Sequence, residues 1–349
     1  IWVEAFLDEL IALQERKNSF INIYTWITIN INNYPRLLKK MRVAGFDLLF
    51  IGIESFNQNS LIETAKVQNA KDELVDMIRN IQSYGFIVVA GLIFGFDTDQ
   101  EDCFQITIDG LRDSGLISGD PSFLTALPGT PLYRRMMLSN RLRAEGDLIS
   151  SASTGGVKYQ TNIRYLQSKE TLVKGFLRFI REYNSGAYQV RRLKVYYSVL
   201  SSYGNYVPLK GQSGGFINAF QFLFMNTKSI KMVTTRLFVF ARDPRNIYFA
   251  LIGVFCMLRN RGPLNPLFFW LFSWSNYVMK YSDLNYSDFD LENVPSNFDL
   301  KKQLIPDNYR ALAAESIPQK KIDAQVKATI RGLGRVLEKE NNTIDHLLG

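Results

Sequence analysis

Residues 88–97 read Val88-Val89-Ala90-Gly91-Leu92-Ile93-Phe94-Gly95-Phe96-Asp97, an apolar run with two glycines that ends on an acid. An apolar run closed by turn residues is typical of a strand buried on both faces, as in a parallel sheet. Glycine inside a strand marks a place where something approaches the backbone closely. Because ligands bind beyond the carboxyl ends of such strands, we expect Asp97 to lie at a ligand-binding edge.

Strand and helix patterns alternate around this run. The order predicts βαβ units and a parallel sheet or barrel. Four strands cannot close a barrel, so we expect the later part of one. Because the sequence begins at Ile1 inside a helical pattern, we expect it to be a piece of a longer chain. Strands are predicted over 20–29, 47–53, 86–96 and 122–127, and helices over 3–17, 34–44 (capped by Asn33), 72–84 and 100–114.

The later chain predicts mostly helices. Ser168 is expected to cap the first of them, because Ser followed by Glu170 in the first turn is a helix-start signal. The expected domains are residues 1–140, 141–283 and 284–349. Within them we predict a loop over 138–159, helices over 168–204 and 214–283, an exposed connector over 284–306 and a charged helix over 308–341.

Composition limits the function classes. The net charge is +8 and the hydrophobic content is 46%, which supports a folded core. Residues 151–246 hold 15 basic and 3 acidic residues, which indicates either an anionic partner or a solvated basic surface. The two cysteines and the lack of a secretory signal indicate a cytoplasmic protein. Both cysteines, Cys103 and Cys256, are expected to be small buried apolar residues, and His346 is expected to be solvated.

Residues 247–258 form an apolar run that is too short to span a bilayer, which takes about 20 residues. We expect an apolar helical pair over 247–279, with its seven large aromatic side chains packed on the protein or on a membrane surface.

Polar residues follow each predicted strand and should meet at one rim. Carboxylates, hydroxyls and glycine backbone suit a ligand with a ribose and an amino acid portion, although polar residues at strand ends can also simply cap helices. The candidate binding residues are Thr25, Glu54, Ser55, Gly91, Ile93, Gly95, Asp97, Thr125 and Pro128. No metal ligand and no catalytic residue is assigned.

Three segments carry a family resemblance: Phe-Ile-Gly-Ile-Glu-Ser at 50–55, Gly-Leu-Ile-Phe-Gly-Phe-Asp at 91–97, and Leu-Thr-Ala-Leu-Pro-Gly-Thr-Pro-Leu at 124–132. They resemble the middle and late strands of the radical S-adenosylmethionine (SAM) barrel. The most similar subgroup has an N-terminal cobalamin-binding domain and includes hopanoid C-2 methyltransferase-like proteins. The resemblance covers about residues 1–200. It implies an α/β fold, with the last four strands of a radical SAM (β/α) barrel followed by a mostly helical C-terminal region.

The resemblance also implies residue roles. Glu54 and Ser55 match the strand end that contacts the ribose or the amino acid part of SAM. Gly91, Ile93 and Gly95 match a strand near the adenine, and residues 124–128 match a strand that contacts the adenine edge. Thr98 stands where many members have a glutamate, and we expect Asp97 and Asp99 to compensate for it.

The function implied for the intact protein is that of a radical SAM enzyme. It would use SAM, a [4Fe–4S] cluster, cobalamin and an external electron donor to generate a 5′-deoxyadenosyl radical for methylation or rearrangement at an unactivated carbon. Three closely spaced cysteines would hold the cluster, and this chain lacks them, so the isolated chain is predicted to be inactive.

Two alternatives remain open. The chain is a non-catalytic nucleoside-binding remnant, or its basic helices bind an anionic membrane or a nucleic acid. The aromatic, basic region suits a small-molecule or lipid substrate and peripheral membrane contact better than a nucleic acid. The reading frame upstream of Ile1 would discriminate the enzyme from the remnant.

Overall fold

The computed structural model describes residues 2–57, 60, 71–143, 159–210 and 227–298. The predictions for residues 150–156, for the helix over 308–341 and for His346 lie outside the described residues. The chain divides into two compact units, one of residues 1–125 with 143–296 and one of residues 126–142 with 297–349. The domain boundaries expected from the sequence remain a prediction.

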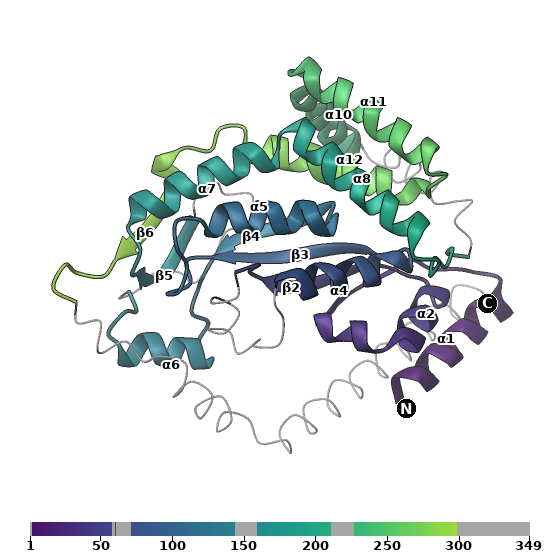
Figure 1. Cartoon of the computed structure of the whole chain (residues 1–349), viewed down its shortest axis with the longest axis horizontal. Coiled ribbons are helices and arrows are strands. Elements are labelled where there is room, and N and C mark those ends of the chain that lie inside the picture. The colour runs from purple at the N-terminus through teal and green to yellow at the C-terminus, as the bar shows by residue number, and fades with distance from the viewer. Residues whose placement is uncertain (1, 58–59, 61–70, 144–158, 211–226, 299–349) are drawn as a thin grey trace. The chain divides into compact units, whose positions relative to one another are not determined.

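A four-stranded parallel sheet forms the centre of the first unit (Figure 1), as predicted. The strands lie in the order β1-β2-β3-β4 and each pairs in parallel with its neighbour. Their carboxyl ends therefore lie at the same edge of the sheet. The strands are β1 (Ile23–Ile27), β2 (Phe46–Glu54), β3 (Ile87–Phe94) and β4 (Ser118–Phe123).

One face of the sheet is buried and the other is half-buried. In β3, Val88, Ala90 and Leu92 are buried, whereas Val89 and Gly91 on the opposite face are only partly covered. The expectation that this strand is buried on both faces is therefore wrong. Successive side chains of a strand point to opposite faces, so helices packed on one face leave the alternate residues half-open.

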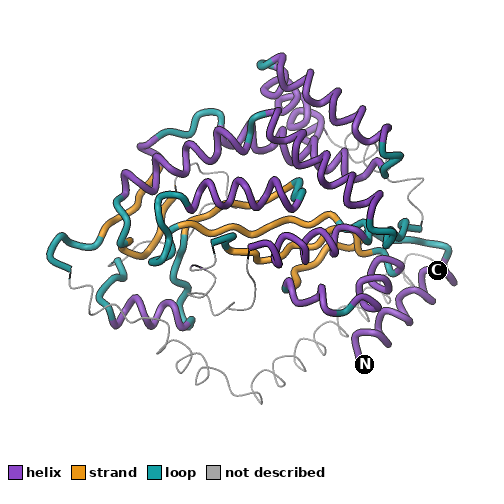
Figure 2. Tube along the Cα trace, viewed as in Figure 1, coloured by secondary structure: helices purple, strands orange, loops and turns teal. Residues whose placement is uncertain are grey.

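Helices follow the strands along the chain, and Figure 2 shows them packed beside the sheet. Asn33 does not cap α2, because it ends a short 3-10 helix (Ile29–Asn33) and Tyr34 occupies the cap position without a side-chain hydrogen bond. Ser168 caps α7 as predicted, since its Oγ accepts from the Thr171 amide at 3.0 Å. The helices are α1 (Trp2–Lys17), α2 (Pro35–Val43), α4 (Lys71–Ser83), α5 (Cys103–Ser114), α7 (Lys169–Tyr183) and α8 (Gly186–Ser202).

Strand β4 begins four residues earlier than predicted. The run Ser118-Gly119-Asp120-Pro121 has the composition of a turn, yet it pairs with residues 89–92 of β3. Within the described residues β4 has β3 as its one neighbour, and a strand at the edge of a sheet tolerates proline. Tertiary pairing thus overrides the local turn signal.

Residues 284–306 are not an exposed connector throughout. After a short 3-10 helix (Tyr286–Asp288), β6 (Phe289–Asn293) pairs in parallel with β5 (Tyr159–Tyr165). Phe289 and Leu291 of β6 are buried. The Asn- and Asp-rich composition hid this strand, because its two apolar residues become buried only when β5 is beside it.

Three further helices complete the first unit: α10 (Thr227–Ala241), α11 (Pro244–Arg259) and α12 (Leu264–Tyr281). The helical pair expected over 247–279 corresponds to α11 and α12. Trp270 and Trp274 are fully buried in its core. Phe255 is 61% exposed and Phe272 is 51% exposed, so not all seven aromatic side chains pack on the described part of the protein, and the packing on a membrane surface stays a prediction. No described helix is both long and apolar enough to cross a membrane.

The second unit contains α6 (Pro131–Leu138), which the sequence places after Pro128-Gly129-Thr130. The Thr130 hydroxyl accepts from the Tyr133 amide at 3.2 Å, and Pro131 occupies the first turn, where its missing N–H costs nothing.

Candidate functional site

The end of β2 has an unusual backbone conformation at Glu54. This residue has φ +66°, in the left-handed region that few residues other than glycine adopt. The pairing register changes just before it: Gly52 faces Gly91 of β3, and Glu54 faces Leu92. Strained conformations of this kind cluster at binding and active sites. The half-buried Glu54 carboxylate is thereby held at the carboxyl edge of the sheet.

Gly95 follows β3 and turns the chain sharply, with φ +93°. The Tyr165 ring of β5 packs against it, and a Cβ on Gly95 would lie 2.6 Å from Cε1 of this ring. The Tyr165 hydroxyl donates to the Leu124 carbonyl at 2.7 Å, just beyond β4. Tyr165 therefore contacts the residues that follow both β3 and β4, and only glycine at position 95 leaves room for its ring.

The loop after β3 closes on the carboxylate of Asp99. This side chain is 3% exposed. Its Oδ2 accepts from the amides of Gly95 at 2.9 Å and Phe96 at 3.1 Å, and its Oδ1 accepts from the Ser60 hydroxyl at 2.5 Å. With its carboxylate used in this way, Asp99 holds the loop. The half-buried Asp97, two residues earlier, is therefore the better candidate for ligand contact.

The half-buried face of the sheet is continuous across the strands. Trp26 pairs with Phe50, and Phe50 pairs with Val89. One row further along, Gly52 pairs with Gly91, which pairs with Asp120 of β4. The Phe50 ring lies over Gly91, because a Cβ there would lie 3.1 Å from it. Glycine at position 91 therefore lets the Phe50 ring lie close to the backbone of β3.

Asp120 is a candidate residue that sequence reasoning missed. The Lys280 ammonium of α12 lies 4.0 Å from its carboxylate. Burial raises the pKa of Asp120, and Lys280 partly offsets this effect. Nearby, burial raises the pKa of Tyr159 to about 12. The sequence signal is an acid two residues before the expected strand start, and the turn-like composition of residues 118–121 hides it.

The remaining predicted residues are distributed as follows. Ser55 is buried and its Oγ accepts from the Asn57 amide at 3.0 Å, which closes the turn after β2. Ile93 belongs to the half-buried face and pairs with Ser122. Thr25 lies within β1, not after it. Thr125 donates to the Phe123 carbonyl at 3.2 Å. Pro128 belongs to the second unit.

Both cysteines are buried, as predicted. Cys103 is the first residue of α5 and Cys256 belongs to α11. Burial raises the pKa of both thiols, so they stay protonated at neutral pH. Within the described part of the chain, no three His, Cys, Asp or Glu residues are arranged to hold a metal ion.

Comparison with known proteins supports the resemblance. No protein-family model matches the chain. Over 136 residues the chain is 32% identical to hopanoid C-2 methylase of Rhodopseudomonas palustris (strain TIE-1), a match that covers 39% of this chain and 26% of that protein. Over 173 residues it is 27% identical to bacteriochlorophyllide d C-12(1)-methyltransferase of Chlorobaculum tepidum, covering 48% of this chain and 35% of that protein. The chain thus spans about a third or less of the length of these relatives.

A solved structure, that of the cobalamin-dependent SAM radical enzyme OxsB with aqua-cobalamin bound, also matches. It is 12% identical, the TM-score is 0.37, and the match covers 88% of this chain and 49% of that chain. The curated relatives are named a methylase and a methyltransferase, which agrees with the resemblance to the hopanoid C-2 methyltransferase-like proteins.

Proposed function

We propose that this chain is the SAM-binding, later part of a cobalamin-dependent radical SAM methyltransferase. The proposal rests on residues 50–55 and 91–97, two of the three segments that carry the family resemblance. Both segments end at the carboxyl ends of neighbouring parallel strands. Glu54 ends β2 in a strained conformation, and Gly95 and Asp97 follow β3 at the same edge of one parallel sheet. The relatives named methylase and methyltransferase support the reaction class.

The four parallel strands are proposed to be the last four of a (β/α) barrel. Within the described residues β1 pairs on one side only, with β2. Its Tyr24 and Trp26 side chains are 63% and 67% exposed. An unprotected edge with exposed aromatic residues is a template for another strand, as the proposal requires.

The residues present fit the nucleoside part of SAM. Phe50 supplies an aromatic surface on the half-buried face, beside Gly52 and over Gly91. Glu54 would accept hydrogen bonds from ribose hydroxyls, for which an ionised acceptor is well suited. When bound, SAM would supply the 5′-deoxyadenosyl radical, and the role of this chain is to orient the nucleoside and exclude water.

The residues present do not fit an iron–sulfur cluster, because cluster ligands are thiolates and the two buried cysteines lie on separate helices. The proposal therefore assigns the cluster, and cobalamin with it, to parts of the protein outside this chain. The isolated chain would then bind SAM without turning it over.

The test is calorimetric titration of the full chain with SAM. We expect measurable binding that is weakened about tenfold in Glu54→Gln, the loss expected when a charged acceptor is removed. Glu170→Gln is the matched control, because Glu170 is an exposed acid paired with Lys174 on α7. Equal affinities in wild type and Glu54→Gln would contradict the proposal. A non-catalytic nucleoside-binding module would give the same titration, and the upstream sequence separates that alternative.

We also propose a peripheral contact with an anionic membrane through α11. Tyr248, Leu251, Phe255 and Leu258 are exposed at intervals of three and four residues, which places them on one face of the helix. Arginines flank this face at both ends of the helix, so the complementary partner is apolar with an anionic surface. The flanking residues are Arg242, Arg245, Arg259 and Arg261.

Flotation with vesicles of mixed phosphatidylglycerol and phosphatidylcholine tests this contact. We expect binding at low salt, weaker binding at high salt, and none for the double variant Leu251→Glu/Phe255→Glu. Leu13→Glu, which changes an exposed leucine of α1, is the control. Absence of flotation at either salt concentration would contradict the proposal.

A further inference from the structure

A strand outside the four-stranded sheet contacts the residues that follow β3 and β4. This strand, β5, belongs to the separate two-stranded sheet with β6. Its last residue, Tyr165, is 1% exposed. The Tyr165 ring packs on Gly95 and its hydroxyl reaches Leu124. One side chain thus touches two of the three segments that carry the family resemblance, although β5 lies in none of them.

The hydroxyl of Tyr165 fixes the main chain of Leu124. It donates to the Leu124 carbonyl at 2.7 Å, and Thr161 Oγ1 lies 3.0 Å from the same hydroxyl oxygen. The Leu124 amide donates in turn to the Phe94 carbonyl at the end of β3, at 2.8 Å. Both polar main-chain groups of Leu124 are therefore used within the protein, one toward β3 and the other toward β5.

The next residue, Thr125, has a main chain that a ligand can use. Thr125 is half-buried, and no hydrogen bond among the described residues uses its main-chain N–H or C=O. Because Leu124 pairs toward β3, the corresponding groups of Thr125 point to the outer side of β4, which has β3 as its one neighbour in the described part of the sheet. Adenine presents an acceptor and a donor side by side on its edge, which one residue's N–H and C=O can complement.

The loop after β3 is held from the side of β5 as well. Gln167, two residues beyond Tyr165, donates through Nε2 to the Asp99 carbonyl. The Asp99 carboxylate accepts from the amides of Gly95 and Phe96. The turn that carries Asp97 is therefore supported by Asp99 within the loop and by Tyr165 and Gln167 outside it.

The supporting strand is itself anchored. Arg143 Nη1 donates to the Thr161 carbonyl of β5 and to the Asp290 carbonyl of β6, both at 3.0 Å. Since this guanidinium group bridges the two strands, β5 is a fixed support from which the Tyr165 side chain projects.

We propose that Tyr165 is a positioning residue for the nucleoside: it fixes the main chain of Thr125 relative to the turn of Gly95 and Asp97. This inference rests on the proposed binding of SAM at the strand ends. Tyr165 is buried, so its effect passes through Leu124 and Gly95. Without its hydroxyl, the residues after β4 would have to be ordered by the ligand, and that cost would appear as lower affinity.

The experiment is calorimetric titration of the full chain and its Tyr165→Phe variant, which keeps the ring on Gly95 and removes the hydroxyl. The matched control is Tyr188→Phe, because the buried Tyr188 hydroxyl donates to the Ile108 carbonyl of α5 at 2.6 Å. Both variants should lower the urea midpoint of unfolding by similar amounts. Only Tyr165→Phe should weaken SAM binding, by about three- to tenfold, the range of one neutral hydrogen bond.

A second ligand separates positioning from a merely structural role. 5′-Deoxyadenosine has the nucleoside of SAM without its amino acid part, so Tyr165→Phe should weaken its binding by the same factor. A structural role would leave both affinities unchanged, as in Tyr188→Phe.

Hydrogen exchange of the wild type gives a readout that needs no variant. Coupling between two sites is reciprocal, so bound SAM should stabilise the Tyr165 contacts and slow exchange of the amides of residues 161–165 about threefold or more. Amides of residues 190–200 in α8 are the control and should be unchanged. If wild type binds SAM, unchanged affinity in Tyr165→Phe or unchanged exchange in β5 would overturn the positioning role and leave the proposed function standing. Absence of SAM binding by wild type would contradict both.

Discussion

The ring of Tyr165 occupies the space that any side chain at Gly95 would need. A Cβ at Gly95 would lie 2.6 Å from Cε1 of Tyr165, and the φ of +93° is unfavourable for any residue with a Cβ. Since Tyr165 also donates to Leu124, this contact sets the spacing between the exits of β3 and β4.

Gly95→Ala should lower the free energy of unfolding by about 2–4 kcal/mol, because backbone strain and a steric clash add. Gly204→Ala is the matched control: φ is +67°, and no atom lies within 4 Å of a Cβ there. It should lose only about 1 kcal/mol, from strain alone. Urea unfolding monitored by circular dichroism measures both, and equal losses would contradict the role given to the Tyr165 ring.

Asp97 and Asp99 should separate into a binding residue and a structural residue. Asp99→Asn weakens the acceptor for the Gly95 and Phe96 amides and should cost about 1–3 kcal/mol of stability. Asp97→Asn should cost less stability than Asp99→Asn, because Asp97 is only half-buried, and should weaken SAM binding. Thermal unfolding and calorimetric titration of the two variants check this. The opposite pattern would mean that the roles are exchanged.

Asp120 should make stability depend on pH. Burial raises its pKa in the folded state, so the folded protein binds this proton more tightly than the unfolded chain does. Stability is therefore lost as the pH rises from about 4, near the unfolded value, through the folded pKa. Asp120→Asn should be more stable than wild type at pH 7 and nearly equal to it at pH 3.5. Because the side chain is 43% exposed, solvent screening should keep the gain below about 1 kcal/mol. A gain of the same size at both pH values would exclude the titration as its cause.

Anaerobic reconstitution of the isolated chain with iron and sulfide should yield no iron–sulfur cluster. The motivation is the absence of three closely spaced thiolates, together with the burial of Cys103 and Cys256. The measurement is iron content per chain after desalting, with the broad absorption of a [4Fe–4S] centre as a second readout. The Cys103→Ser/Cys256→Ser double variant is the control and should behave as wild type does. Stoichiometric iron in wild type but not in the double variant would refute the prediction.

The sequence alone determined the parallel sheet. Helix and strand periodicities alternate without interruption from residue 3 to residue 114, and glycines end several of the helices, as at Gly115 with φ +69°. These signals are local, because they depend on side-chain spacing and on single backbone conformations. The three family motifs are likewise local in sequence, so the resemblance was visible without coordinates.

The tertiary structure decided which residues could act. The sequence placed Asp97 and Asp99 together after one strand, but only the folded loop shows that the Asp99 carboxylate is used by two amides and Ser60. Strand β4 and its Asp120 were hidden by turn-like composition until β3 lay beside them. Strand β6 was hidden in the same way until β5 lay beside it.

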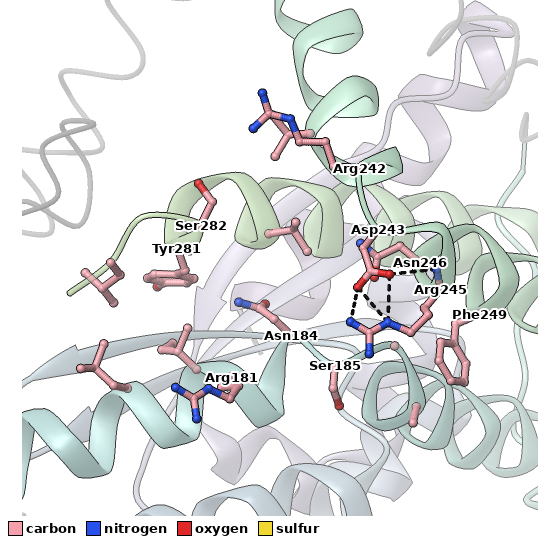
Figure 3. A pocket seen from close by; sticks show the side chains of 17 residues that line it. Arg181, Asn184, Ser185, Arg242, Asp243, Arg245, Asn246, Phe249, Tyr281 and Ser282 are labelled. Atoms are coloured by element: carbon pink, nitrogen blue, oxygen red, sulfur yellow. Dashed lines mark hydrogen bonds and ion pairs between the residues drawn. The ribbon is translucent and has the colours of Figure 1, made fainter.

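A cavity of about 1040 Å³ among the helices of the later chain (Figure 3) was also invisible in the sequence. Arg181 and Arg242 line it and are 61 positions apart in the chain, and nothing local connects them. Hydrogen bonds and burial between distant segments place such residues on one cavity. These contacts cannot be predicted from the residues that lie next to each arginine in the sequence. Periodicity therefore determined the elements of this protein, and packing between those elements decided where its charges and strained residues meet.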